Sequence, residues 1–491
     1  MSKSKNILYV FGSKLLIFLF TILKGLLVPV YLGPKMYGVL NTIGLVKTIL
    51  RFTDFGFDKA YLRLRLSILG EGGDKDRLLS LQNTVFTVLS LSGFIGAAIT
   101  LTIPWFLRLE EAELVKVMHY GFAITAFEHI LLAIGGFYTG TCVSQKRFSL
   151  RASLNVLQVF LNIILLLAMV FVWQIYGVWI AELIAILVVQ IIYFIKTDVK
   201  ARFTPDWQQI REVGRYALPF CFTKFSFYLA QMIDKTVILR YLTFGELGLY
   251  SFALNIAFQS QMAYKAIIEV LSPYFMEDMG EKTDAMHLSD KIMFHIRSLA
   301  LVSSIGALNS ILFCDILGLL VPKYSASMFT LKVLFINSYV VTVPLYQSYI
   351  LGAPGVRKQN WNNASMVVAG ILNWTVSVFL INKGWGINGV AVGTLVSTCI
   401  WKMLQMILAH RYYQQTWNLP FYFKIGWPVL GLCCITLYRQ CYPLHFDASF
   451  AMLTILSNVL LIIFFRTEIR ELWPRIKNKV KSLKGFRKLI R

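Results

Sequence analysis

Apolar runs of about 20 residues recur along the whole chain, and no other feature of the sequence restricts its fold as strongly. A helix of that length crosses the hydrocarbon core of a bilayer with all its backbone hydrogen bonds made internally. Of the 491 residues, 57% are hydrophobic, and the mean hydropathy is +0.63. The runs are continuous and do not alternate with polar residues, so a β-barrel is disfavoured. The sequence therefore predicts an all-α polytopic membrane protein.

From these runs we predict about fourteen transmembrane helices. The predicted spans are residues 7–31, 36–58, 79–103, 113–138, 150–175, 177–196, 215–240, 246–275, 292–320, 327–351, 363–382, 386–409, 421–439 and 448–466. The first run carries lysines and lacks a small-residue cleavage site, so we expect no cleavable signal peptide. Because the number of spans is even, both termini are expected on one side of the membrane.

The distribution of cations among the predicted loops gives the orientation. The cation-rich loops contain Lys59, Arg63, Arg65, Lys75 and Arg77; Lys146, Arg147 and Arg151; Lys196, Lys200, Arg202, Arg211 and Arg215; and Arg357 and Lys358. The alternate loops are short and poor in cations, and one of them is acidic, with Glu110, Glu111 and Glu113. Since cytoplasmic loops carry the excess of Lys and Arg, we expect both termini in the cytoplasm.

Weak internal repeats suggest two halves. The matching positions are Tyr31, Leu32 and Gly38 with Tyr241, Leu242 and Gly248, and Ile175, Gly177 and Val178 with Ile387, Gly389 and Val390. We therefore predict a six-helix lobe over residues 1–200 and a second six-helix lobe over 201–415. A pseudo-two-fold axis along the membrane normal would relate them. An appended helix pair is expected over 416–466, followed by a basic cytoplasmic tail over 467–491.

Cations inside the apolar helices are the main indication of function. A cation near the bilayer centre costs about 2.5–3.5 kcal/mol by insertion scales, so such residues must face protein or water. The candidate substrate-binding residues are Lys14, Lys24, Lys47, Arg51, Lys224, Lys235 and Lys265. Few acids lie deep enough to pair with them, so we interpret them as the lining of a water-filled central cavity that holds an anion. The alternative is that they snorkel or pair with nearby carboxylates.

Acidic and histidine side chains within the spans are candidates for coupling or gating. These residues are Asp54, Glu128, His129, Asp234 and Glu269. Lys47, Arg51, Asp54 and Asp58 are spaced i, i+4, i+7 and i+11, which predicts one stripe along a continuous helix. Glu128 and His129 lie in the middle of a span, where a desolvated carboxylate can exchange a proton near neutral pH; a structural pair is the alternative.

The formal net charge is +23, which in a soluble protein would raise the question of a nucleic-acid partner. Here the cytoplasmic loops explain most of the charge. The tail after Arg466 interleaves cations with apolar residues, which predicts a helix on anionic lipid. The seven cysteines have no metal-ligand or redox spacing, so neither a metal site nor a cofactor is expected. We expect a membrane, and no nucleic acid, as a partner.

Three segments resemble a known family. Residues 31–38, Tyr-Leu-Gly-Pro-Lys-Met-Tyr-Gly, are similar to the LGP-x-x-YG turn between the first two helices of polysaccharide exporters. Asp54-Phe55-Gly56 is similar to their D-x-G segment, and the run from Asp234 to Ser251 also matches. The chain thus resembles the Wzx-type O-antigen and capsule flippases of the multidrug/oligosaccharidyl-lipid/polysaccharide exporter superfamily. The likeness covers most of the chain and is weakest in the appended pair.

The resemblance implies a flippase of the bacterial inner (plasma) membrane. Such a flippase is implied to move an undecaprenyl-pyrophosphate-linked oligosaccharide from the cytoplasmic to the outer leaflet by alternating access. A polysaccharide polymerase and chain-length proteins are implied as candidate partners. The related lipid II flippase is implied to hold pyrophosphate with basic residues on its first two helices. By position, that role falls here on Lys14, Lys24 and Arg51.

Two other classes are compatible with parts of the sequence. A drug–cation antiporter of the same superfamily would need anionic or aromatic surfaces and usually has twelve spans, so the cationic stripes disfavour it. A membrane polymerase, ligase or glycosyltransferase would need catalytic groups on sizeable outer loops. The predicted outer loops have about ten residues or fewer. We therefore expect a transporter and not an enzyme.

Overall fold

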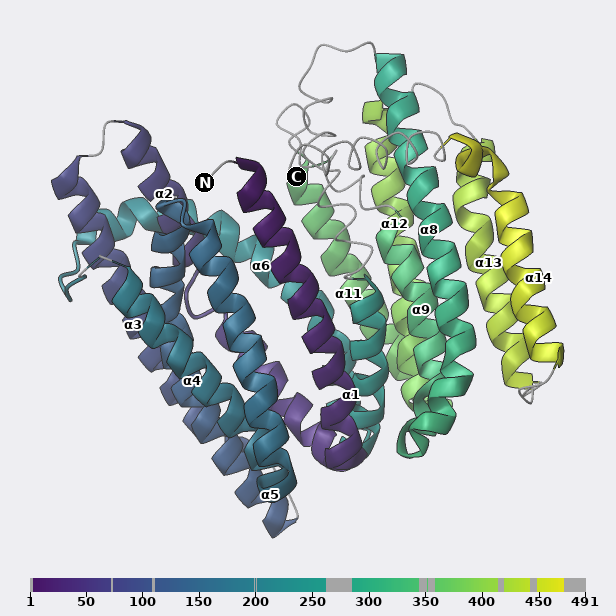
Figure 1. Cartoon of the computed structure of the whole chain (residues 1–491), viewed down its shortest axis with the longest axis horizontal. Helices are drawn as coiled ribbons and strands as arrows, with labels where there is room; N and C mark the ends of the chain where they lie inside the picture. The colour runs from purple at the N-terminus through teal and green to yellow at the C-terminus, as the bar shows by residue number, and fades with distance from the viewer. Residues whose placement is uncertain are drawn as a thin grey trace, which may run out of the picture. The chain divides into compact units, whose positions relative to one another are not determined.

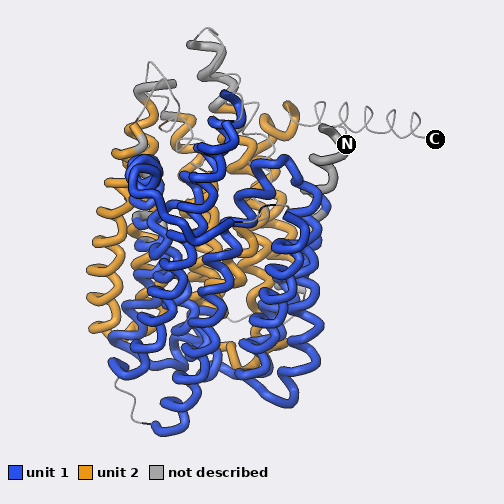
Figure 2. Tube along the Cα trace, turned by 90° about the vertical axis from the view of Figure 1, so that its left-hand side faces the viewer, with its two compact units in different colours: residues 1–251 blue, residues 252–491 orange. Residues whose placement is uncertain are grey.

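Helices make up the regular structure of the described part of the chain. The structure is a computed structural model that describes residues 3–71, 74–107, 111–197, 199, 201–261, 285–343, 351, 358–413, 419–441 and 448–471 (Figure 1). The chain divides into two compact units, Met1–Ser251 and Phe252–Arg491, which are coloured separately in Figure 2. The predicted division into two six-helix lobes and an appended pair stays a prediction.

Among its described residues, the first unit contains six helices that lie wholly within it. They are α1 (Lys3–Leu50), α2 (Phe57–Gly70), α3 (Lys75–Phe106), α4 (Ala112–Ser144), α5 (Phe148–Lys196) and α6 (Trp207–Tyr241); residues 244–251 begin the next helix. Helix α4 packs on α3 and α5, α1 packs on α5, and the short α2 packs on α3, α4 and α6. The second unit contains α8 (Ala285–Leu320), η1 (Pro322–Ser327), α9 (Met328–Thr342), α11 (Gln359–Asn382), α12 (Gly386–Tyr413), α13 (Leu419–Cys441) and α14 (Ala448–Phe464).

Eight helices of the described residues are long and apolar enough to cross a membrane. They are Leu16–Leu50, Lys75–Phe106, Ala112–Ser144, Phe148–Lys196, Ile296–Leu320, Asn360–Asn382, Gly386–His410 and Pro420–Cys441. Their exposed side chains are largely apolar, because lipid and not water surrounds such helices. The prediction of an all-helical, multi-pass membrane protein is confirmed.

Two of the long helices are kinked and each consists of two helical segments. In α1 the break is at Gly33, whose φ of 71° and ψ of 169° leave the helical region just before Pro34. In α5 the break is at Gln174, with a φ of 46° and a ψ of −122°. The sequence predicts span boundaries next to both positions. Glycine tolerates the positive φ at the first break, and proline is accepted at the start of the segment that follows.

The second predicted span ends earlier than expected, and this corrects the predicted stripe. Helix α1 ends at Leu50, residues 51–56 form turns, and α2 begins at Phe57. Phe55 (φ 46°) and Gly56 (φ 79°) are both left-handed, so a right-handed helix cannot continue through them. The carboxylate of Asp54 accepts a hydrogen bond from the Gly56 N–H at 3.0 Å, which stabilises the turn instead. Lys47, Arg51, Asp54 and Asp58 therefore do not share one helix.

Glycines allow two close helix contacts that position these elements. A Cβ at Gly38 would overlap the Phe244 carbonyl, and one at Gly248 would overlap the Pro34 carbonyl. The two glycines matched by the sequence repeat therefore face each other in the first unit. A Cβ at Gly56 would lie 2.7 Å from the Ala217 carbonyl oxygen, so the turn after α1 also lies directly against α6.

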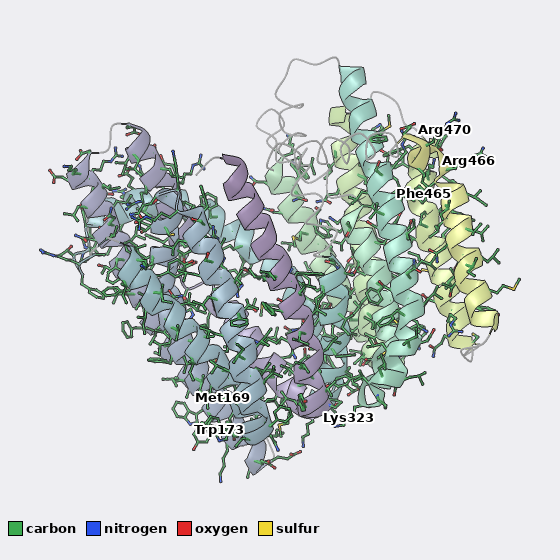
Figure 3. All side chains as sticks on the ribbon, in the orientation of Figure 1. Met169, Trp173, Lys323, Phe465, Arg466 and Arg470 are labelled. Atoms are coloured by element: carbon green, nitrogen blue, oxygen red, sulfur yellow. The ribbon has the colours of Figure 1, made fainter. Side chains whose placement is uncertain are left out.

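In the second unit, α9 is buried among α8, α12 and α13. Asp315 of α8 pairs with Lys332 of α9 and with Arg439 of α13, each at 2.7 Å. Beyond α14, residues 466–471 are helical, and Figure 3 labels Arg466 and Arg470 there. Within this segment Glu468 lies 2.7 Å from Lys424 of α13. The rest of the predicted tail helix lies outside the described residues.

Candidate functional site

Five of the predicted cations have described side chains in the first unit. Lys24 and Lys47 belong to the two segments of α1, Arg51 follows α1 directly, and Lys224 and Lys235 lie on α6. The predicted Lys14 lies on α1, but its side chain is outside the described part of the structure. Lys265 and Glu269 also fall outside the described residues.

Lys24 and Lys47 belong to an ionic network that joins α1, α4 and α5. The ammonium of Lys47 lies 2.5 Å from a carboxylate oxygen of Glu128 and 3.3 Å from one of Glu182. The other oxygen of Glu182 lies 3.6 Å from the Lys24 ammonium. The side chain of Glu128 is 2% exposed, whereas that of Glu182 is 33% exposed. Two ammonium groups thus share two carboxylates.

Sequence reasoning did not identify Glu182. It lies in the second segment of α5, where it is the only charged residue between Trp179 and Lys196. Its position as a lone carboxylate inside a predicted span could have indicated a buried ion pair, because a carboxylate without a partner is unfavourable in a membrane.

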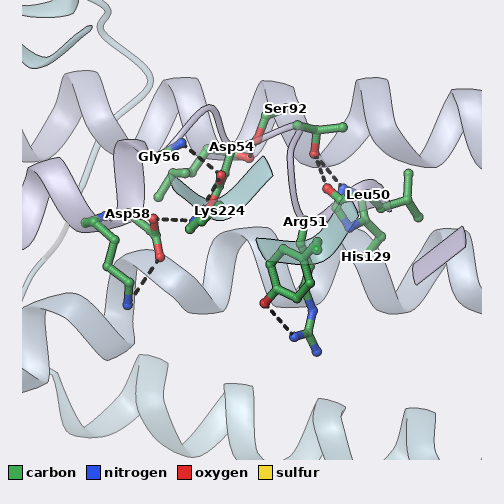
Figure 4. A network of polar contacts seen from close by, with 12 residues as sticks. Leu50, Arg51, Asp54, Gly56, Asp58, Ser92, His129 and Lys224 are labelled. Atoms are coloured by element: carbon green, nitrogen blue, oxygen red, sulfur yellow. Dashed lines mark hydrogen bonds and ion pairs between the residues drawn. The ribbon is translucent and has the colours of Figure 1, made fainter. Parts of the chain in front are cut away.

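Lys224 joins α6 to the turn and to the start of α2, as Figure 4 shows. Its ammonium donates to Asp54 Oδ2 at 2.9 Å and to Asp58 Oδ1 at 2.9 Å. One cation therefore neutralises part of the charge of two carboxylates. The expectation that too few deep acids would pair with the cations is wrong for Lys24, Lys47 and Lys224. Two of their partners, Asp54 and Asp58, lie beside Lys224 only because the chain turns after Leu50.

Arg51 and Lys235 differ from the other three cations in having neutral partners. The Arg51 guanidinium donates to the Tyr228 hydroxyl at 3.3 Å (Figure 4), and the Lys235 ammonium donates to Asn41 Oδ1 at 3.0 Å. Within the described residues, neither forms an ion pair with a carboxylate within 4.0 Å. Both contacts join α6 to α1 or to the turn after it, so two cations with neutral hydrogen-bond partners lie along the same helix contact.

The remaining predicted gating residues have separate partners. The His129 ring nitrogen Nε2 lies 3.0 Å from the Thr53 hydroxyl, so α4 contacts the turn after α1 (Figure 4). Its neighbour Glu128 faces Lys47 instead. Asp234 is buried and accepts a hydrogen bond of 2.6 Å from the Tyr250 hydroxyl. Across the described residues, no group of three or more His, Cys, Asp or Glu side chains could hold a metal ion.

The fold and these contacts define a polytopic helical membrane protein with an ionic network inside its first unit. Residues 4–279, more than half of the sequence, match the family described as polysaccharide biosynthesis protein. The chain belongs to this family. A comparison with curated protein sequences returns no match.

Solved structures of the multidrug/oligosaccharidyl-lipid/polysaccharide exporter superfamily have the same fold. The lipid II flippase MurJ, in an inward closed conformation, matches with a TM-score of 0.73 and 12% identity, over 96% of this chain and 100% of that chain. An inward-facing multidrug resistance MATE family transporter matches with a TM-score of 0.61 and 13% identity, over 84% and 94% of the two chains. A transporter of the superfamily from Pyrococcus furiosus matches with a TM-score of 0.55 and 13% identity, over 82% and 93%.

Proposed function

We propose that the protein is a flippase that moves an undecaprenyl-pyrophosphate-linked oligosaccharide from the cytoplasmic to the outer leaflet. It would do so by alternating access, through a central cavity lined with cations. Membership of the polysaccharide biosynthesis family and the fold shared with a lipid II flippase support this assignment. No enzymatic step is required, because export changes only the position of the substrate.

The observation that carries the proposal is that Arg51 and Lys235 contact neutral side chains and, among the described residues, form no ion pair with a carboxylate. Each cation contacts a neutral side chain, Tyr228 or Asn41, although it belongs to a helical unit that crosses a membrane. A charge held at membrane depth without a counter-ion is unfavourable, so an anionic ligand is the chemical complement of this pair. Pyrophosphate fits this role, because guanidinium and ammonium groups both form charge-assisted hydrogen bonds to phosphate oxygens.

We assign the other predicted residues to the same transport path because their side chains are charged or can exchange a proton. Lys24, Lys47 and Lys224 add positive charge whenever their carboxylate partners release them. We assign Lys14 and Lys265 to substrate binding as well. Asp54, Glu128, His129, Asp234 and Glu269 are proposed as gating or coupling residues.

The proposal also covers the number of spans, their arrangement and the orientation of the chain in the membrane. We infer about fourteen spans, arranged as two six-helix lobes with an appended pair, in the bacterial inner membrane with both termini cytoplasmic. A polysaccharide polymerase and chain-length proteins are the proposed partners. A drug–cation antiporter is the second candidate, because MATE transporters share the fold. The cationic contacts of Arg51 and Lys235 favour an anionic substrate over a cationic one.

A reconstitution experiment tests the proposal. The purified full chain is placed in proteoliposomes with a fluorescent undecaprenyl-pyrophosphate-linked oligosaccharide, and an impermeant quencher reports how much label reaches the outer leaflet. We expect the protein to accelerate exposure over empty liposomes, and the Arg51→Ala/Lys235→Ala double variant to lose most of that acceleration. Lys383→Ala, which changes an exposed lysine after α11, is the matched control and should behave as wild type. Wild-type protein without acceleration would refute the flippase assignment, and a double variant as fast as the control would refute the role of Arg51 and Lys235.

A further inference from the structure

Glu182 is placed so that a single carboxylate contacts both segments of α1. One of its oxygens lies 3.6 Å from the Lys24 ammonium, and the other lies 3.3 Å from the Lys47 ammonium. Lys24 precedes the kink at Gly33, and Lys47 follows it. The two lysines therefore converge on one anionic group, and that group is supplied by α5.

The contacts of Glu182 are longer than that of Glu128, and its side chain is more exposed. Glu128 lies 2.5 Å from the Lys47 ammonium with a side chain that is 2% exposed. Glu182 is 33% exposed, and both of its contacts are longer than 3 Å. Breaking a buried pair is strongly unfavourable, whereas a partly exposed pair contributes little. Lys47 thus has one buried and one partly exposed partner, and Lys24 has only the partly exposed one among the described residues.

We propose that Glu182 is an internal counter-ion that occupies a phosphate site formed by Lys24 and Lys47 while no substrate is bound. The phosphate groups of the lipid-linked substrate would displace it. The inference rests on the proposed function of the chain as a pyrophosphate-lipid flippase. A carboxylate and a phosphate each present two oxygens on one central atom, so a phosphate can make the same two ammonium contacts. Because Glu182 is 33% exposed, displacing its carboxylate does not require moving a fully buried group.

Charge balance shows what this displacement achieves. Lys24, Lys47, Glu128 and Glu182 sum to zero formal charge, so the empty site does not leave a charge unbalanced in the membrane. A bound phosphate replaces Glu182 as the partner of both lysines, and the returning carboxylate then competes with the phosphate for them. A transport site must bind its cargo well enough to load it and weakly enough to release it. Competition from the Glu182 carboxylate weakens the binding of the phosphate and so favours its release.

The test separates binding from turnover. The full chain is purified in nanodiscs and titrated with inorganic pyrophosphate by isothermal titration calorimetry. Glu182→Gln removes the charge and keeps the shape, so we expect its Kd to fall by about twofold to fivefold, the range set by a partly exposed charge pair. Adding Lys24→Gln to Glu182→Gln should cancel the gain. In the proteoliposome assay, Glu182→Gln should expose the labelled lipid more slowly than wild type, because release becomes slower.

A second lysine–glutamate pair provides the matched control. Lys35 and Glu111 lie 2.6 Å apart, but their side chains are 52% and 56% exposed. Glu111→Gln removes the same charge from an ordinary surface pair, so its pyrophosphate Kd and its transport rate should equal those of wild type. Glu182→Ala serves as a second neutral variant of Glu182 in case the glutamine variant does not fold.

The outcomes distinguish this inference from the proposed function. If wild-type protein binds pyrophosphate and the neutral Glu182 variants bind it no more tightly than Glu111→Gln, the counter-ion role is wrong and the flippase assignment stands. If neither wild-type protein nor the Glu182 variants bind pyrophosphate, both are overturned, because the phosphate site itself is missing. Tighter binding together with slower lipid exposure, confined to the Glu182 variants, supports the inference.

Discussion

At the scale of single residues, the cations of the first unit fall into two groups according to their partners. Lys24, Lys47 and Lys224 contact carboxylates, so their charge is balanced within the protein. Arg51 and Lys235 contact a hydroxyl and an amide oxygen, which are dipoles without net charge. Among the described residues, an anionic substrate could contact the second group without first breaking an ion pair.

Arg51 should therefore be the most sensitive of these positions in cells. We expect Arg51→Ala to reduce surface polysaccharide by about tenfold or more, the effect of losing one charge-assisted phosphate contact. Arg51→Lys should reduce export less than Arg51→Ala if the positive charge matters more than the planar, bidentate geometry of the guanidinium group. Surface polysaccharide is measured by gel or lectin staining, and a blot of the membrane fraction checks that the protein level is unchanged. Normal export from a stably expressed Lys14, Arg51 and Lys224 triple alanine variant would contradict a cation-lined path.

At the scale of elements, the turn over residues 51–56 organises the site. It ends α1, and three neighbouring side chains hold it: His129 contacts Thr53, Lys224 contacts Asp54, and Tyr228 contacts Arg51. Phe52 also packs edge-to-face on Tyr228, with ring centroids 5.6 Å apart. The turn is thus the point at which α1, α2, α4 and α6 meet, and its backbone conformation decides which side chains can contact each other.

Gly56 should be intolerant of even the smallest side chain. Its positive φ and the 2.7 Å approach of the Ala217 carbonyl both oppose a Cβ, so Gly56→Ala is expected to destabilise the protein by about 1–3 kcal/mol. Thermal unfolding in detergent, followed by intrinsic fluorescence, measures the shift in Tm. Gly44→Ala is the control, because Gly44 is helical, a Cβ there would have no neighbouring atom within 4 Å, and alanine is the better helix former. Equal Tm values for the two variants would show that the turn does not require glycine.

At the scale of the whole molecule, the charge asymmetry of the loops makes a topological prediction. Both termini and the segments around Arg63, Arg147, Arg202 and Arg357 should be cytoplasmic. In a background without the seven native cysteines, an impermeant thiol reagent added to intact cells should label cysteines placed at Glu111 and Asn382. Permeabilised cells provide the control for reactivity at every position. Labelling at residue 202 in intact cells would overturn this orientation.

The direction of transport gives a second prediction at this scale. A pyrophosphate carries about two negative charges, and moving one charge through the membrane potential yields about 2.3 kcal/mol per 100 mV. If the protein cations stay in place, outward movement of the head group gains roughly 4–5 kcal/mol in an energised cell. A potassium–valinomycin potential imposed on proteoliposomes at equal pH should therefore raise the export rate in one polarity and lower it in the other. An unchanged rate on reversal, with a strong response to a pH step, would indicate proton coupling through residues such as Glu128.

The sequence alone determined the class of the protein and the location of most helices. Hydrophobic run length is a local property, and the bilayer imposes the same length requirement on every span, so the helical membrane fold could be predicted without knowing any contact. The breaks at Gly33 and Gln174 were predictable for the same reason, because each lies within two residues of a predicted span boundary. The deep cations could likewise be listed from the sequence, since each stands out within apolar surroundings.

Only the tertiary structure decided which cations are paired. The partners of Lys47 and Lys224 lie on other elements, at sequence separations of up to 170 residues, and helical spacing carries no information about such contacts. Helical spacing even misplaced Asp54 and Asp58, because the left-handed pair Phe55 and Gly56 is stabilised by an Asp54 hydrogen bond and by the close approach of α6. Charge pairing depends on how helices pack against each other, and a single sequence specifies each helix more directly than it specifies their packing.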